Sequence, residues 1–222
     1  MQAIASERAD ELLWLGRYME RVHTTVAEYF VGYDRMIDES LDSHADYCRA
    51  MSIPDVYPDK AAFLRDYPFD ESNPDSILSN LIRAYDNAVV LRDEIGTETL
   101  SYVQLAVYEM RKASVSRAPM IQMLSAMDYI YAFWGCLDDA VQWDEVRSIV
   151  KTGRRLERLD LYIRFGRSAD ELRTECTRLA RRIARTPLRY DPADIVRIEG
   201  CLSSDPVDRA GAIRLLESLI RG

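Results

Sequence analysis

A short charged motif occurs twice in this chain, each time within a segment of helical periodicity. Residues 16–21 read Gly-Arg-Tyr-Met-Glu-Arg, and residues 153–158 read Gly-Arg-Arg-Leu-Glu-Arg. Around the first copy, apolar residues recur every three or four positions from Leu12 to Met36. This spacing predicts a long helix that begins near Ser6. The repeated motif therefore places charge inside helices that must pack against other helices.

The charges of the first copy require partners from elsewhere in the fold. Arg17, Glu20 and Arg21 are set into a helix that is apolar on almost every side, and such a helix is buried. A buried charge must be paired or liganded. One glutamate cannot neutralise two arginines, so at least one arginine needs an acid from another helix or an anionic ligand.

The second copy offers the same charges at the same angular positions. Arg154 and Arg158 correspond to Arg17 and Arg21, and Glu157 corresponds to Glu20. We therefore expect the two motif-bearing helices to pack together. Two interpretations of the pairing stay open: a buried salt-bridge network that fixes helix register, or an arginine-lined site for an anionic ligand.

The rest of the chain has the pattern of an all-α, multi-helix bundle, without alternating strand segments. We expect one domain over residues 1–222, with a motif-bearing core at 6–165 and C-terminal helices at 168–222. Local signals predict helix ends at an Asn73 cap followed by Pro74, at Gly96, at a Ser168–Glu171 capping box and at an Asp205 cap. Further helices are expected at 45–50, 60–67, 74–95, 98–113, 118–141, 144 onward, 169–185, 192–200 and up to about 219.

Composition excludes several classes of protein. The net charge of −8 argues against a nucleic-acid binder, although residues 147–189 carry +8. That basic stretch either neutralises the acidic remainder across the fold or forms an anion-binding surface. No apolar run approaches the length of a membrane span, and the first ten residues are too polar for a signal peptide, so we expect a cytoplasmic protein. The four cysteines are scattered and are expected to be thiols.

The residues suited to catalysis are few. No serine or cysteine has a nearby histidine to activate it. Glu20 and His23 form an E-x-x-H pair of the kind used in di-iron bundles, but the second copy has Asp160 in place of the histidine, so neither a metal nor a cofactor is expected. Glu20 and Glu157 are the candidate catalytic carboxylates. The candidate substrate-binding residues of the motifs are Arg17, Arg21, Arg154 and Arg158.

The two motif copies and a middle segment together resemble the bacterial alpha-E family, a set of predicted helical domains named for a Glu-Arg motif. The first signature is matched by Ser6, Ala9, Leu12, Trp14, Gly16, Arg17, Tyr18, Glu20 and Arg21. The middle one is matched by Asn73, Pro74, Ser76, Ile77, Asn87, Ala88 and Arg92, and loosely by Glu98; the late one is matched by Gly153, Arg154, Leu156, Glu157 and Arg158. Glu7 and Val89 stand where the family has arginines.

The resemblance implies a context rather than a reaction. Members of the family occur beside, or fused to, circularly permuted ATP-grasp ligases and transglutaminase-like proteases. This implies a helical partner of an ATP-grasp ligase in amide- or peptide-bond formation, which binds an anionic small molecule or peptide. Asn87, Arg92 and Glu98 join the candidate substrate-binding residues on this ground. The alternative is a non-catalytic scaffold or adaptor in which the Glu-Arg motifs are structural.

Overall fold

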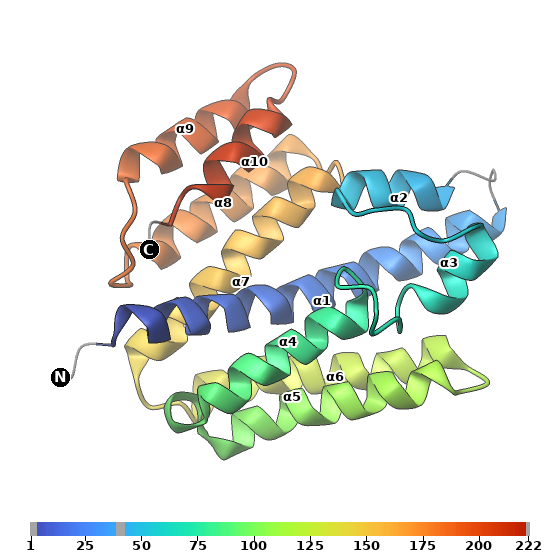
Figure 1. The fold of residues 1–222 in the computed structure, drawn as a ribbon. Coiled ribbons are helices and arrows are strands. Elements are labelled where there is room, and N and C mark those ends of the chain that lie inside the picture. Colours follow the sequence, from blue (N-terminus) through green and yellow to red (C-terminus); the bar gives the residue numbers. More distant parts are fainter. Residues whose placement is uncertain (1–3, 39–42, 221–222) are drawn as a thin grey trace. The chain divides into compact units, whose positions relative to one another are not determined.

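The computed structural model describes residues 4–38 and 43–220, and within them the chain forms ten helices and no strand (Figure 1). The chain divides into two compact units. The first combines the residues up to 20 with those from 142 onward, and the second comprises residues 21–141. The all-α class predicted from the sequence is confirmed. The division into a single domain stays a prediction.

The first unit contains the start of α1 (Ser6–Asp38) and the four last helices. Helix α7 packs against α8 and α10, and α9 packs against both α8 and α10. Their apolar stripes meet in one core, formed by Leu156, Leu159, Ile163, Leu172, Cys176, Leu179, Ile183, Ile198, Leu202, Ala212, Leu216 and Leu219. The bounds of these helices are α7 Asp144–Arg164, α8 Ala169–Ile183, α9 Pro192–Ser203 and α10 Arg209–Glu217.

Two helix starts in this unit illustrate how side-chain capping sets the boundaries. Ser168 and Glu171 form the predicted capping box at the start of α8. The predicted Asp205 cap of the last helix is wrong, because the carboxylate of Asp208 accepts a hydrogen bond from the backbone N–H of Gly211 at 2.9 Å. Helix α10 therefore begins at Arg209.

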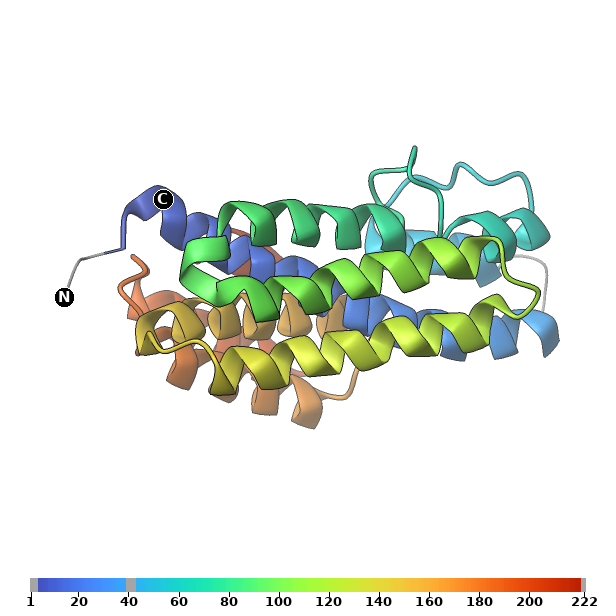
Figure 2. The same cartoon turned by 90° about the horizontal axis from the view of Figure 1, so that it is seen from below.

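The second unit contains the remainder of α1 and the five helices that follow it. Helix α5 packs against both α4 and α6, and the three run side by side (Figure 2). Helices α2 and α3 contact each other, and the rings of Phe63 and Tyr67 on and just after α3 stack at 4.7 Å. The bounds are α2 Ser43–Met51, α3 Lys60–Asp66, α4 Ile77–Val90, α5 Arg92–Ser114 and α6 Pro119–Asp139.

The helix that was expected from Pro74 to Ile95 is shorter at both ends. Ser76, rather than Asn73, is the N-cap of α4, because its hydroxyl accepts from the N–H of Ser79. The helix ends at Val90, and Leu91 separates it from α5. The predicted break at Gly96 is present as a kink within α5, where Gly96 adopts φ 80° and ψ 156°.

Candidate functional site

The glycines of the two motifs let α1 and α7 approach to backbone contact. A Cβ added to Gly16 would lie 1.9 Å from the carbonyl oxygen of Val150, and one added to Gly153 would lie 2.0 Å from that of Leu13. Each glycine faces the residue three positions before the other glycine, so the crossing is symmetric. Only a residue without a side chain fits at either position.

At this crossing, charged side chains of one motif form ion pairs with those of the other. Arg17 Nε donates to Glu157 Oε2 at 2.8 Å, and Arg154 Nε donates to Glu20 Oε2 at 3.0 Å. Arg158 Nε donates to the second oxygen of Glu20 at 2.5 Å. The prediction that the two motif helices pack together is confirmed. For Arg17, Arg154 and Arg158, the negative charge comes from the opposite copy of the motif.

Burial divides the cluster into inner carboxylates and outer guanidinium groups. The side chains of Glu20 and Glu157 are completely buried, whereas those of Arg17, Arg154 and Arg158 keep between 14% and 21% of their surface. Burial lowers the pKa of Arg154, and the charge of Glu20 only partly offsets this effect. Burial acts in the same direction on Arg158, but the charge of Glu20 and its hydrogen bond outweigh it and raise the pKa of Arg158.

Further charged residues extend the cluster along α7, and they were not predicted from the sequence. Arg155 Nη1 and Arg178 Nη1 both donate to Glu175, whose side chain is 4% exposed. The available signal was the position of Glu175 next to Cys176 on the buried stripe of α8. An acid on a buried stripe requires a cation from a neighbouring helix.

A second extension lies one helical turn beyond the motif. Arg164 Nε donates to Asp160 Oδ2 at 2.8 Å, and Arg164 Nη2 donates to Glu217 at 3.2 Å. Burial raises the pKa of Asp160 even though Arg164 opposes it. The i,i+4 spacing of Asp160 and Arg164 was the signal that could have revealed this pair.

The geometry favours an orienting role for the motif glutamates. Each motif carboxylate is enclosed and accepts hydrogen bonds from arginine, so it suits charge pairing better than proton transfer to a substrate. The guanidinium groups have the better access to solvent. Arg17 also lies over the ring of Trp14, 4.3 Å from its centroid, which orients the side chain further. The catalytic roles assigned to Glu20 and Glu157 stay predictions.

The other predicted substrate-binding residues belong to the second unit. Arg21 is its first residue, and the backbone carbonyl of Arg21 accepts a hydrogen bond from Thr25 Oγ1 at 2.7 Å. Arg92 and Glu98 are exposed, Asn87 is half-buried, and Arg92 Nε donates to Thr97 Oγ1 at 3.2 Å. The participation of these four residues in one site with the motif pairs stays a prediction.

The described residues contain neither a metal-binding group nor a membrane-spanning helix. Within residues 4–38 and 43–220, no three His, Cys, Asp or Glu side chains are grouped so that they could hold a metal ion. His23, the histidine of the E-x-x-H pair, has its Nε2 3.2 Å from the hydroxyl of Tyr131. No helix in the same ranges is long and apolar enough to span a membrane.

Comparison with known proteins identifies the family. A family model described as a predicted alpha-helical domain with a conserved ER motif, Alpha-E, matches residues 4–194. No curated protein and no solved structure matches the chain. The match covers both motif helices and most of the remaining chain, and the chain belongs to the Alpha-E family.

Proposed function

We propose that this protein is a bacterial, cytoplasmic helical adaptor that works with a circularly permuted ATP-grasp ligase in amide- or peptide-bond formation. In this proposal the Glu-Arg motifs are structural and hold α1 against α7 in the first unit. The observation that carries the structural role is the complete burial of Glu20 and Glu157, each paired with arginine from the opposite motif. The choice of partner rests on the family and on the genomic context that the resemblance implies.

Buried ion pairs constrain the two helices that carry them. Removing one partner of such a pair leaves an uncompensated charge in the interior and costs about 3–5 kcal/mol, so intact pairs enforce one arrangement of the two helices. A symmetric crossing with backbone contact gives the same constraint by shape alone. Together they make a rigid unit, which suits a protein that presents a surface to a larger enzyme.

The proposal is tested by reconstitution with the purified ligase of the same organism. We expect the protein to co-elute with the ligase in size-exclusion chromatography and to increase ATP-dependent ADP release. A Glu20→Gln variant should stimulate the ligase in proportion to its folded fraction, measured by circular dichroism. A Glu71→Gln variant is the matched control, because Glu71 is 50% exposed and pairs with Arg111, which is 56% exposed.

Two results would contradict the proposal. The first is a fully folded Glu20→Gln variant that binds the ligase but no longer supports the reaction, because this outcome assigns the carboxylate to chemistry. The second is the absence of both co-elution and stimulation, which removes the proposed partner while leaving the structural role of the motifs to be tested separately.

One observation favours a second candidate function, recognition of an anionic carboxylate or acyl phosphate. Arg17 and Arg158 each use Nε to hold a motif glutamate, and within the described residues their terminal nitrogens make no hydrogen bond. A guanidinium fixed in this way presents a fork that matches a carboxylate or phosphate. Calorimetric titration with acetyl phosphate and acetate tests it. Binding that is lost in Arg17→Lys, but kept in the exposed control Arg185→Lys, supports this function, and the absence of binding removes it.

A further inference from the structure

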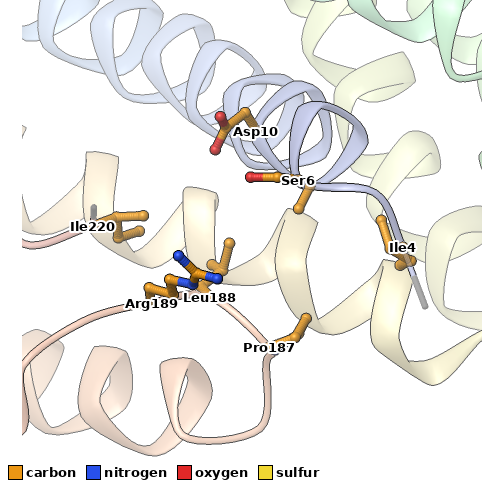
Figure 3. A pocket seen from close by; sticks show the side chains of 8 residues that line it. Ile4, Ser6, Asp10, Pro187, Leu188, Arg189 and Ile220 are labelled. Atoms are coloured by element: carbon orange, nitrogen blue, oxygen red, sulfur yellow. The ribbon is translucent and has the colours of Figure 1, made fainter. Parts of the chain in front are cut away.

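A pocket in the first unit lies between the start of α1 and the segment that joins α8 to α9 (Figure 3). Its volume is about 360 Å³, which is within the range of small-molecule sites. The lining combines apolar side chains with three polar ones. The residues that line it are Ile4, Ser6, Ala9, Asp10, Pro187, Leu188, Arg189 and Ile220.

The two charged side chains of the pocket, Asp10 and Arg189, carry opposite charges and lie on different walls. Asp10 and Ser6 are on α1, and Arg189 extends from the α8–α9 connection on the other side of the pocket. Within the described residues, neither Asp10 nor Arg189 forms an ion pair or a side-chain hydrogen bond. Most of the charged side chains on α7 and α8 of this unit are paired with a neighbour, as Arg164 is with Asp160. Both charges at the pocket are therefore available to a ligand.

The backbone around the pocket is held in place on both walls. Tyr190, directly after Arg189, forms an antiparallel bridge with Ile220, so the α8–α9 connection is fixed to the end of the chain beyond α10. On the other wall, Asp10 lies in the second turn of α1, next to the buried Ala9. The two charges are thus carried by backbone whose position is set by packing and hydrogen bonding.

We propose that this pocket binds a small zwitterion with an apolar side chain, either a free α-amino acid or a dipeptide. The ammonium group pairs with the carboxylate of Asp10, and the ligand carboxylate pairs with the guanidinium of Arg189, an arrangement that suits bidentate hydrogen bonds. The aliphatic side chains of Ile4, Leu188 and Ile220 receive the apolar part of the ligand. The site uses none of the Glu-Arg motif residues, so the proposal stands apart from the adaptor function.

The test is calorimetric titration of the intact protein with four probes: leucine, the dipeptide leucyl-leucine, N-acetyl-leucine and leucinamide. We expect leucine or the dipeptide to bind, and the comparison between them identifies the source of the zwitterion. N-acetyl-leucine lacks the ammonium group and leucinamide lacks the carboxylate. Each should bind about 10- to 100-fold more weakly, the effect of losing one charged hydrogen-bonding partner.

The variants make the assignment specific to each charge. In Asp10→Asn, the preference for leucine, which has a free ammonium, over N-acetyl-leucine should disappear. In Arg189→Gln, the preference for leucine, which has a free carboxylate, over leucinamide should disappear. Glu7→Gln and Arg185→Gln are the controls, because both residues are exposed, lie close by in sequence and do not line the pocket.

Three results would overturn the proposal. One is the absence of binding by leucine and by the dipeptide up to ~10 mM, which is too weak for a built site. Another is equal binding of all four probes by the wild-type protein. The third is an unchanged preference in both Asp10→Asn and Arg189→Gln.

Discussion

Replacing Gly153 with alanine places a methyl group where α7 touches the backbone of α1. The new Cβ would lie 2.0 Å from the carbonyl oxygen of Leu13, whereas ordinary van der Waals contact begins at 3.4 Å. The obstructing atom belongs to a helix backbone and cannot rotate away. The helices must therefore separate by more than 1 Å along this direction.

The separation also weakens the reciprocal ion pairs. The hydrogen bonds from Arg17 to Glu157 and from Arg154 to Glu20 measure 2.8 and 3.0 Å, so the same displacement stretches them beyond good geometry. Overpacking costs about 1–3 kcal/mol, and a weakened hydrogen bond to a charged group costs about 1.5–3 kcal/mol. Alanine gains back about 1 kcal/mol in helix propensity. We expect a net loss of about 3 kcal/mol in the free energy of unfolding.

The assay is urea denaturation followed by circular dichroism, with Gly200→Ala as the matched control. Gly200 lies within α9 of the same unit, and an added Cβ there would meet no atom within 4 Å. The control should therefore gain about 0.5–1 kcal/mol from helix propensity alone. The two substitutions are chemically identical and should change the free energy of unfolding in opposite directions. A Gly153→Ala variant as stable as the Gly200→Ala control would refute the close crossing of α1 and α7.

Three further predictions concern individual charges and thiols. Glu157→Gln should destabilise the protein by about 3–5 kcal/mol, whereas Glu71→Gln should cost under about 1 kcal/mol because that pair is exposed; equal urea midpoints would contradict this. Burial raises the pKa of Asp160 in the folded state, so its contribution to stability is present below the unfolded value and is lost as pH rises through the folded value. The unfolding free energy of the wild-type protein, measured against that of Asp160→Asn, should therefore decline as pH rises from 4 to 7, and a difference that grows with pH would exclude it. Burial raises the pKa of Cys48 and Cys176 to about 11, so at pH 8 a thiol reagent should modify these two residues only after denaturant is added. Rapid labelling of either cysteine in the native protein, detected by mass spectrometry, would contradict this prediction.

Local signals in the sequence predicted much of the fold because they act over a few residues. The Ser168–Glu171 capping box depends on an i,i+3 spacing and is present in the structure. The cap of α4 was misplaced from Ser76 to Asn73, since both residue types cap helices well and their difference depends on the surrounding packing. Boundaries of this kind are set by tertiary contacts as much as by propensity.

The motif cluster was predicted in outline because charge in an apolar helix demands a partner. The sequence identified the arginines and glutamates but not their reciprocal arrangement, because Arg17 and Glu157 are separated by 140 positions. The role of Gly16 and Gly153 was missed, since a glycine in a helix carries no signal of what it faces. Glu175 was overlooked for a related reason: its partner Arg155 lies on α7, and this pairing becomes evident only once α7 and α8 are packed.

The motif charges stabilise the crossing of α1 and α7 by pairing with each other. A double-mutant cycle of Arg154→Met and Glu20→Gln, measured by urea denaturation, tests this most directly. It isolates the interaction of these two side chains from the hydrogen bond that Arg158 donates to Glu20. We predict a coupling free energy above about 1.5 kcal/mol, compared with less than about 0.5 kcal/mol for the exposed pair of Arg111 and Glu71. Additive effects of the two substitutions at Arg154 and Glu20 would contradict the account.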